Sequence, residues 1–151
     1  MRVSRLGFTI GILGALLVAP AASAAAPPTT TIQIDIVFGD AGSEDFTTSG
    51  GVVCASGTAV TDPVFVAGFG RQGRGAASFH LIKTLTCADG TGTFQIRVNA
   101  GSSPNSSGTV GGFSVVGGTG AYAGLHGGGS LVGTYTDDGI IDVYTGRLVN
   151  D

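Results

Sequence analysis

Hydrophobic and polar residues alternate along most of the chain after its first thirty residues. Ile32, Ile34, Ile36 and Phe38 share one parity, and mainly polar residues separate them. This pattern is typical of a strand with one buried and one wetter face. The segment 93–100 repeats the alternation. Helical periodicity is missing from this part of the chain, so the pattern predicts a protein built from strands.

Eight such strands are predicted, separated by turns rich in glycine and aspartate. They are expected near residues 31–39, 50–60, 63–69, 76–87, 92–100, 109–116, 129–136 and 139–149. Asp138-Gly139 is the strongest local signal, because Asp-Gly is typical of tight hairpin turns. Strands without covering helices must bury their faces against one another. We therefore expect a single eight-stranded antiparallel β-barrel, with a β-sandwich as the alternative.

The first 24 residues have the features of a secretory signal peptide. Arg2 and Arg5 precede an uncharged apolar run, and Ala22-Ser23-Ala24 fits a signal peptidase site. The run covers 14 residues, Leu6 to Ala19, whereas a transmembrane helix needs about 20. The expected organisation is a signal peptide (1–24), a spacer rich in Ala, Pro and Thr (25–30) and a barrel domain (31–151). We expect a secreted protein with no membrane span after cleavage.

Charge and cysteine content narrow the class of protein further. Removal of residues 1–24 leaves five basic residues against ten acidic ones, a net charge of −5. An acidic chain without a basic cluster argues against nucleic-acid binding. Cys54 and Cys87 lie in strand-like segments of an exported chain, so we expect a disulfide between them, with two buried thiols as the alternative. The two Cys and two His residues lack metal-ligand spacing, so no metal site is expected.

Other charged residues are expected on the surface. Asp40, Glu44 and Asp45 form an acidic loop, in which a calcium site is conceivable although EF-hand spacing is absent. Arg97, Asp142 and Arg147 are expected as cross-strand ion pairs on an outer wall. His80 is expected to be a surface or hydrogen-bonded histidine rather than a catalytic one.

The glycine-rich stretch 117–129 fits the loose dinucleotide fingerprint Gly-x-Gly-x-x-Gly/Ala at Gly118 to Ala123. A dinucleotide site requires a helix after the glycines, because the helix N-terminus holds the pyrophosphate. Three consecutive glycines, Gly127 to Gly129, follow instead and disfavour a helix. The stretch is therefore predicted to allow a strained turn and close backbone approach at a barrel end. No cofactor is expected.

The same stretch resembles a known family. Val115 to Tyr122 is similar to the Gly-Gly-Thr-Gly-x-aromatic signature of the dirigent and allene oxide cyclase barrel-like superfamily. Ile34 to Gly39 resembles the end of the first dirigent strand. The two motifs together cover fewer than 20 residues. The resemblance implies an eight-stranded antiparallel barrel, often with a central cavity, in a family that includes cyclases and proteins that steer radical coupling.

The resemblance also nominates site residues. Asp35 falls where dirigents keep a pocket aspartate, Tyr122 falls at the aromatic position, and His126 falls where dirigents carry arginine. These three are the candidate ligand-binding residues, and Asp35 and His126 are the candidate catalytic residues. Asp35 is a general acid or base if its face of the strand points into a cavity, and is merely solvated if that face points outward. His126 is in a glycine loop, where exposure is the default and titration near neutral pH is the functional option.

Two classes of function remain open. One is a secreted barrel that binds a small apolar molecule, with or without a cofactor-free isomerase or cyclase activity, because an eight-stranded barrel can hold one small ligand. The other is a non-catalytic exported structural or interaction module whose barrel is filled with side chains. Whether the protein is an enzyme, what its ligand is and which oligomer it forms are not determined by the sequence.

Overall fold

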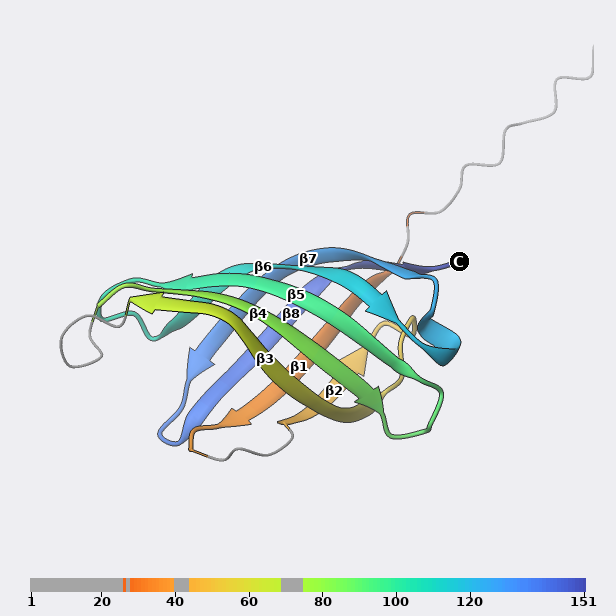
Figure 1. The fold of residues 1–151 in the computed structure, drawn as a ribbon, viewed down its shortest axis with the longest axis horizontal. Helices are drawn as coiled ribbons and strands as arrows, with labels where there is room; N and C mark the ends of the chain where they lie inside the picture. The colour runs from red at the N-terminus through yellow and green to blue at the C-terminus, as the bar shows by residue number, and fades with distance from the viewer. Residues whose placement is uncertain (1–25, 27, 40–43, 69–74) are drawn as a thin grey trace, which may run out of the picture.

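The computed structural model describes residues 26, 28–39, 44–68 and 75–151. Its elements in chain order are β1 (Thr29–Val37), β2 (Glu44–Ser49), β3 (Ser56–Gly68), β4 (Ala77–Cys87), β5 (Thr93–Ser102), β6 (Gly108–Gly118), the short helix η2 (Gly120–Tyr122), β7 (Leu125–Tyr135) and β8 (Gly139–Asn150). Each strand pairs antiparallel with the next, and β8 pairs with β1. The result is a closed eight-stranded barrel whose near and far walls cross obliquely (Figure 1), as tilted barrel strands do. The predicted fold is confirmed.

Alternation along the strands decides which side chains enter the barrel. Ile32 and Ile34 of β1 are fully buried, whereas Gln33 and Asp35 between them are exposed. The segment 93–100 follows the same rule, and its apolar side chains Phe94, Ile96 and Val98 are buried inside the barrel. The alternation predicted one buried and one wetter face for each of these strands, and the structure places the apolar face inside the barrel.

The first half of the chain differs from the prediction in where its strands lie. Residues 44–49 form β2, although an acidic loop was expected there. The predicted strands 50–60 and 63–69 are instead one strand, β3, with an irregular register between Pro63 and Phe65. Proline is tolerated because, among the described residues, β2 pairs only with residues 56–59 of β3, so the described part of the chain places no second hydrogen-bonded strand beside Pro63. The total of eight strands was right because these two errors cancel.

One half of the barrel is filled with side chains. Three aromatic rings contact one another edge to face: Phe46 lies 6.1 Å from Phe94, and Phe94 lies 5.6 Å from Tyr122. The predicted disulfide Cys54–Cys87 is present beside them, with both cysteines buried and their Cα atoms 5.9 Å apart. We call this part of the molecule the filled half. Aromatic burial of this kind supplies much of the free energy of a small core.

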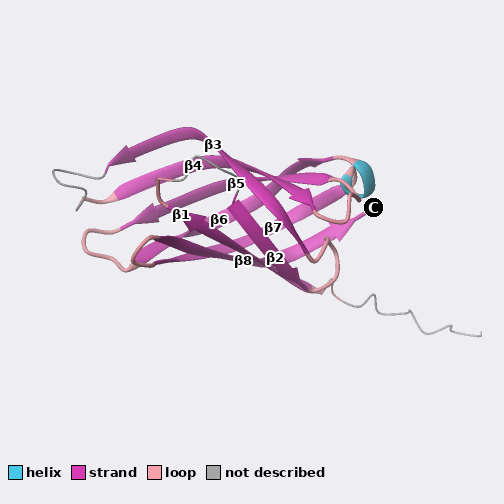
Figure 2. Cartoon of the chain, turned by 90° about the horizontal axis from the view of Figure 1, so that it is seen from below, coloured by secondary structure: helices cyan, strands magenta, loops and turns pink. Residues whose placement is uncertain are grey.

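The glycine-rich stretch 117–129 forms the turn at the end of the filled half. The helix η2 lies there beside the chain's C-terminus (Figure 2). Gly120 has a φ of 59°, and a Cβ at this position would collide with the backbone of Thr91. The stretch therefore serves a tight turn and a close approach, as predicted. β1 begins at Thr29, inside the expected spacer, and the expected signal peptide lies outside the described residues.

The hairpin predicted at Asp138-Gly139 is confirmed between β7 and β8, closed by a bond from the Thr136 amide to the Gly139 carbonyl (3.0 Å). In the described part of the chain, no helix has the length and apolar character needed to cross a membrane.

Candidate functional site

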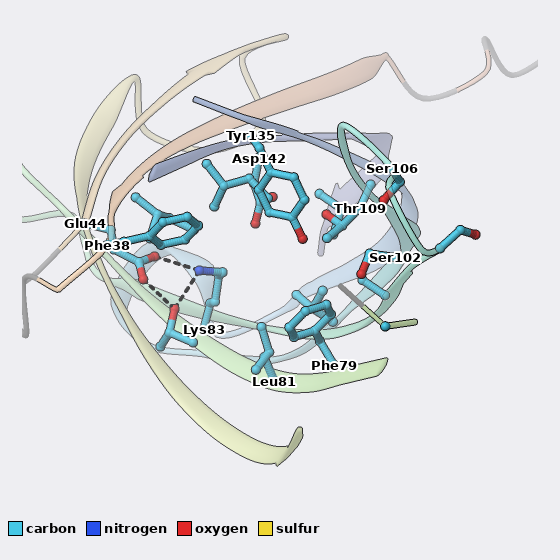
Figure 3. Close-up of a pocket in the computed structure, with 18 of the residues that line it drawn as sticks. Phe38, Glu44, Phe79, Leu81, Lys83, Ser102, Ser106, Thr109, Tyr135 and Asp142 are labelled. Carbon is cyan, nitrogen blue, oxygen red and sulfur yellow. Dashed lines mark hydrogen bonds and ion pairs between the residues drawn. The ribbon is translucent and has the colours of Figure 1, made fainter. Parts of the chain in front are cut away.

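The other half of the barrel contains a cavity of about 620 Å³. We call it the open half. Apolar side chains from five strands form much of its wall, as Figure 3 illustrates for Phe79 and Leu81. The main apolar wall residues are Ile36, Phe79, Leu81, Val98, Leu131 and Ile140. Cavities of this size and character are typical of small-molecule sites.

A buried ion pair forms one side of the cavity. The Lys83 ammonium lies 2.6 Å from Oε2 of Glu44 and also donates to the Thr61 hydroxyl at 2.6 Å (Figure 3). The Thr61 hydroxyl in turn donates to Oε1 of Glu44 at 2.9 Å. Lys83 is 1% exposed and Glu44 15%. The three residues come from β4, β2 and β3, so this network joins the strands where β2 begins.

Asp142 on β8 is the other acidic residue among the described residues that line the cavity. It is 6% exposed, and its Oδ2 accepts a hydrogen bond from the Tyr144 hydroxyl at 3.0 Å. Its Oδ1 is buried without a hydrogen-bond partner among the described residues. Burial raises the pKa of the Asp142 carboxyl above its ordinary value; Lys83 and the bond from Tyr144 oppose the rise, and Glu44 adds to it. Burial also raises the pKa of Tyr144, so its hydroxyl stays a donor.

Gly133 on β7 makes the room that Asp142 occupies. A Cβ built on Gly133 would collide with Oδ1 of Asp142 and with the hydroxyl of Thr109, which lies on β6. The two oxygens therefore approach the same bare stretch of backbone from the strands on either side. The absence of a side chain at this position lets a carboxyl and a hydroxyl share one small region of the wall.

No protein-family model, curated protein or solved structure matches this chain. The resemblance to the dirigent and allene oxide cyclase superfamily therefore stays a prediction that rests on its two short motifs.

Asp35 lies outside the cavity. Its side chain is exposed on the outer face of β1, where Oδ1 accepts a hydrogen bond from Gln33 at 3.1 Å. The apolar side chains at the even-numbered positions of β1 fill the interior. The side chains between them, including that of Asp35, must therefore face water. Asp35 thus points out of the barrel into solvent, and this geometry does not support a role for it in a pocket.

Tyr122 and His126 lie at the opposite end of the barrel from the cavity. Tyr122 is buried in the filled half, where its hydroxyl lies 2.9 Å from that of Thr91. His126 is exposed, with Nδ1 3.0 Å from the Gly124 carbonyl and 3.6 Å from a carboxylate oxygen of Asp151. Neither residue lines the cavity. The structure therefore does not bring the three nominated residues together.

Two interior residues were missed or misplaced by the sequence analysis. Asp142 was expected on the outer wall, but it lies inside the barrel. Both faces of β8 carry apolar residues, so the alternation pattern could not show which face points inward. Lys83 was passed over, although a signal existed: it has the same parity as Phe79, Leu81 and Leu85. His80, by contrast, is exposed and lies 2.6 Å from the Asn99 side chain, as a hydrogen-bonded surface histidine would.

Glu44 was assigned to an acidic surface loop, and it instead begins β2 and lines the cavity. Across the described parts of the chain, no three His, Cys, Asp or Glu side chains are grouped so that they could hold a metal ion. The candidate site therefore consists of two carboxyls, one ammonium and hydroxyls in an apolar wall.

The raised pKa of Asp142 gives a testable dependence of stability on pH. The folded protein holds this proton more tightly than the unfolded chain does. Asp142 therefore contributes most to the free energy of unfolding below the ordinary aspartate pKa of about 3.9, and the contribution is lost as pH rises through the raised value. Relative to Asp142→Asn, which does not titrate at this position, the wild type should lose stability as the pH rises above about 3.9.

Urea unfolding of both proteins across this range measures the effect. Other carboxyls titrate in both proteins, so the difference between the two curves isolates Asp142. Curves that stay parallel at every pH would show that the carboxyl has its ordinary pKa.

Proposed function

We propose that this protein binds a small, largely apolar molecule in the open half of its barrel. The observation that carries the proposal is the cavity itself, about 620 Å³ in a chain of 151 residues. Protein interiors are normally packed to the density of organic crystals, with few voids larger than a water molecule. A barrel filled throughout is the alternative, and the described side chains fill only the other half.

The composition of the wall supports an apolar ligand with few polar groups. Aliphatic and aromatic side chains form much of the wall, the charged groups are those of the Lys83 network and Asp142, and Ser102, Ser103, Asn105 and Ser106 add uncharged polar groups. Binding sites commonly combine a hydrophobic lining with a few fixed polar groups that orient the ligand.

Cofactor-free isomerase or cyclase chemistry in the same cavity is a second candidate, and one observation favours it. A carboxyl whose pKa is raised by burial can hold and return a proton nearer neutral pH than an exposed one. Asp142 has this property and lines the cavity. We assign any such chemistry to Asp142 rather than to Asp35 or His126, which lie elsewhere.

Export of the protein is part of the proposal. A disulfide forms readily in an oxidising compartment and rarely in the cytosol, and Cys54–Cys87 is present. The pattern of residues 1–24 supports the same conclusion.

Filling the cavity tests the proposal. Leu81→Trp should lower the affinity for the neutral apolar dye N-phenylnaphthylamine by about tenfold or more, equivalent to about 1.4 kcal/mol, because the indole takes ligand space. The matched control is Ile82→Trp, which adds the same ring at the next position, on the other face of β4. The chain has no tryptophan of its own, so each variant also carries a single fluorescent reporter.

Dye titration of the wild type and both variants, with unfolding curves to confirm that all three fold, gives the answer. An undiminished affinity in folded Leu81→Trp, or no dye binding to the wild type, would refute binding in the cavity.

A further inference from the structure

The charges of the cavity are unequal in number. Among the described residues that line it, Glu44 and Asp142 are acidic and Lys83 alone is basic. Lys83 lies 2.6 Å from Glu44, so this pair is close to neutral as a unit. Asp142 has no ion-pair partner within 4.0 Å in the described part of the chain. An ionised Asp142 therefore leaves one buried negative charge without a direct counter-charge.

The hydrogen bonds of Asp142 are also incomplete. Only Oδ2 has a donor, the hydroxyl of Tyr144 at 3.0 Å, and Oδ1 has none although it is buried. A carboxylate can accept about four hydrogen bonds, and buried polar groups are almost always paired. The carboxyl group lies at the cavity wall in Figure 3, with Thr109 close by. Oδ1 itself is buried against Gly133, whereas the Asp142 side chain as a whole lines the cavity, so a ligand there can bring a donor to the carboxyl group.

The lack of a side chain at Gly133 allows the Asp142 carboxyl and the Thr109 hydroxyl to lie close together. A Cβ at Gly133 would collide with both Oδ1 of Asp142 and the hydroxyl of Thr109. The carboxylate and the hydroxyl thus converge from β8 and β6. An ammonium group has three donors and no acceptor, so it can pair with the carboxylate and donate to the hydroxyl at the same time.

We infer that the ligand of this cavity is an apolar molecule carrying one protonated amine, and that the ammonium group pairs with the Asp142 carboxylate beside the Thr109 hydroxyl. The inference rests on the proposed binding function and names the class of ligand. The apolar wall of the open half holds the body of the molecule. Its cationic end supplies a counter-charge for the Asp142 carboxylate.

Other ligand charges fit this site less well. An anion would add negative charge near Glu44 and Asp142, and Lys83 is already bonded to Glu44 and Thr61. A neutral alcohol brings a single donor and leaves the carboxylate charge buried without a partner, which is costly. A protonated amine removes both deficits.

Binding of an amine should also depend on pH. A cation beside Asp142 favours the ionised carboxyl, so affinity for the amine should fall as acid protonates Asp142. The titratable groups that line the cavity or adjoin Asp142 are Glu44 on β2, Lys83 on β4, Tyr135 on β7 and Tyr144 on β8. Neither tyrosine is expected to change charge in acid, and affinity for a neutral alcohol provides the control for a change in Glu44 or Lys83.

The test uses three ligands of equal length: octylamine, octanol and octanoate. Each competes with N-phenylnaphthylamine for the disulfide-bonded wild-type protein at neutral pH. Octylamine is expected to bind at least about tenfold more tightly than octanol, equivalent to about 1.4 kcal/mol, and octanoate is expected to bind least. Asp142→Asn should abolish the preference for octylamine over octanol. Asp35→Asn, the same change on the outer face of β1, should keep that preference.

The outcomes separate the inference from the function on which it rests. If the dye itself does not bind, the proposed binding function is wrong. If dye and octanol bind but octylamine binds no more tightly, or if Asp142→Asn keeps the preference, the amine inference is wrong and the binding function stands. Should Asp142→Asn fail to fold, the wild type decides: octylamine affinity that does not fall in acid relative to that of octanol overturns the inference.

Discussion

Lys83→Met is expected to lower the free energy of unfolding by about 3 kcal/mol, the lower end of the range for breaking a buried ion pair. The change removes the ammonium that holds Glu44 and Thr61 and leaves the Glu44 carboxylate without its counter-charge. Glu44 is 15% exposed, so water screens it in part and the cost stays at this lower end. Methionine keeps most of the length of the lysine side chain, so lost packing contributes little. Urea unfolding measures the loss.

The double variant Lys83→Met/Glu44→Gln separates charge from shape. A glutamine can still accept the hydrogen bond from Thr61, and no charge is left uncompensated. Replacement of both members of a buried pair is often close to neutral, so the double variant should recover most of the stability lost in Lys83→Met. A double variant as unstable as the single one would mean that the ion pair is not what Lys83 contributes.

Loss of the disulfide has the other large expected effect. Cys54→Ala/Cys87→Ala should lower the free energy of unfolding by about 3–4 kcal/mol on the chain-entropy model. The bond joins residues 33 apart in the sequence, so it restricts the unfolded chain across β3 and β4. Alanine suits the buried positions because it introduces no unpaired polar group. Guanidinium unfolding of the variant and the oxidised wild type gives the difference.

Reduced wild-type protein is the matched control, because it lacks the bond and keeps both sulfur atoms. It should unfold close to the variant and well below the oxidised protein. Equal stability of the oxidised and reduced forms would show that the unfolded chain does not gain the expected freedom.

Pattern alone determined the class of this fold. Alternation of period two in segments such as 93–100 requires one face inside, and the lack of helical periodicity leaves strands only one another to pack against. Asp138-Gly139 marked a hairpin, and two cysteines in a chain whose first 24 residues have the features of a signal peptide indicated their pairing. Each of these inferences depends on local chemistry or on composition, which a single sequence contains.

Strand β2 could not be predicted from the pattern of apolar and polar residues. The segment Glu44 to Ser49 contains one apolar residue, Phe46, so it shows no alternation. Hydrogen bonds from β1 on one side and β3 on the other hold it in the barrel. Glu44 consequently begins a strand and faces the cavity, where the sequence had suggested an exposed acidic loop.

The candidate site was decided by tertiary structure. Asp142 and Lys83 are charged residues within strands, and a charge in a strand ordinarily faces water. Which parity points inward depends on register, and a shift of one residue would send every side chain to the other face. Closure of β8 against β1 and β7 turned Asp142 into the barrel and left Asp35 outside. The sequence thus determined that strands pack against one another and predicted the barrel and its disulfide, whereas closure of the sheet excluded a sandwich and selected the charges that the barrel encloses.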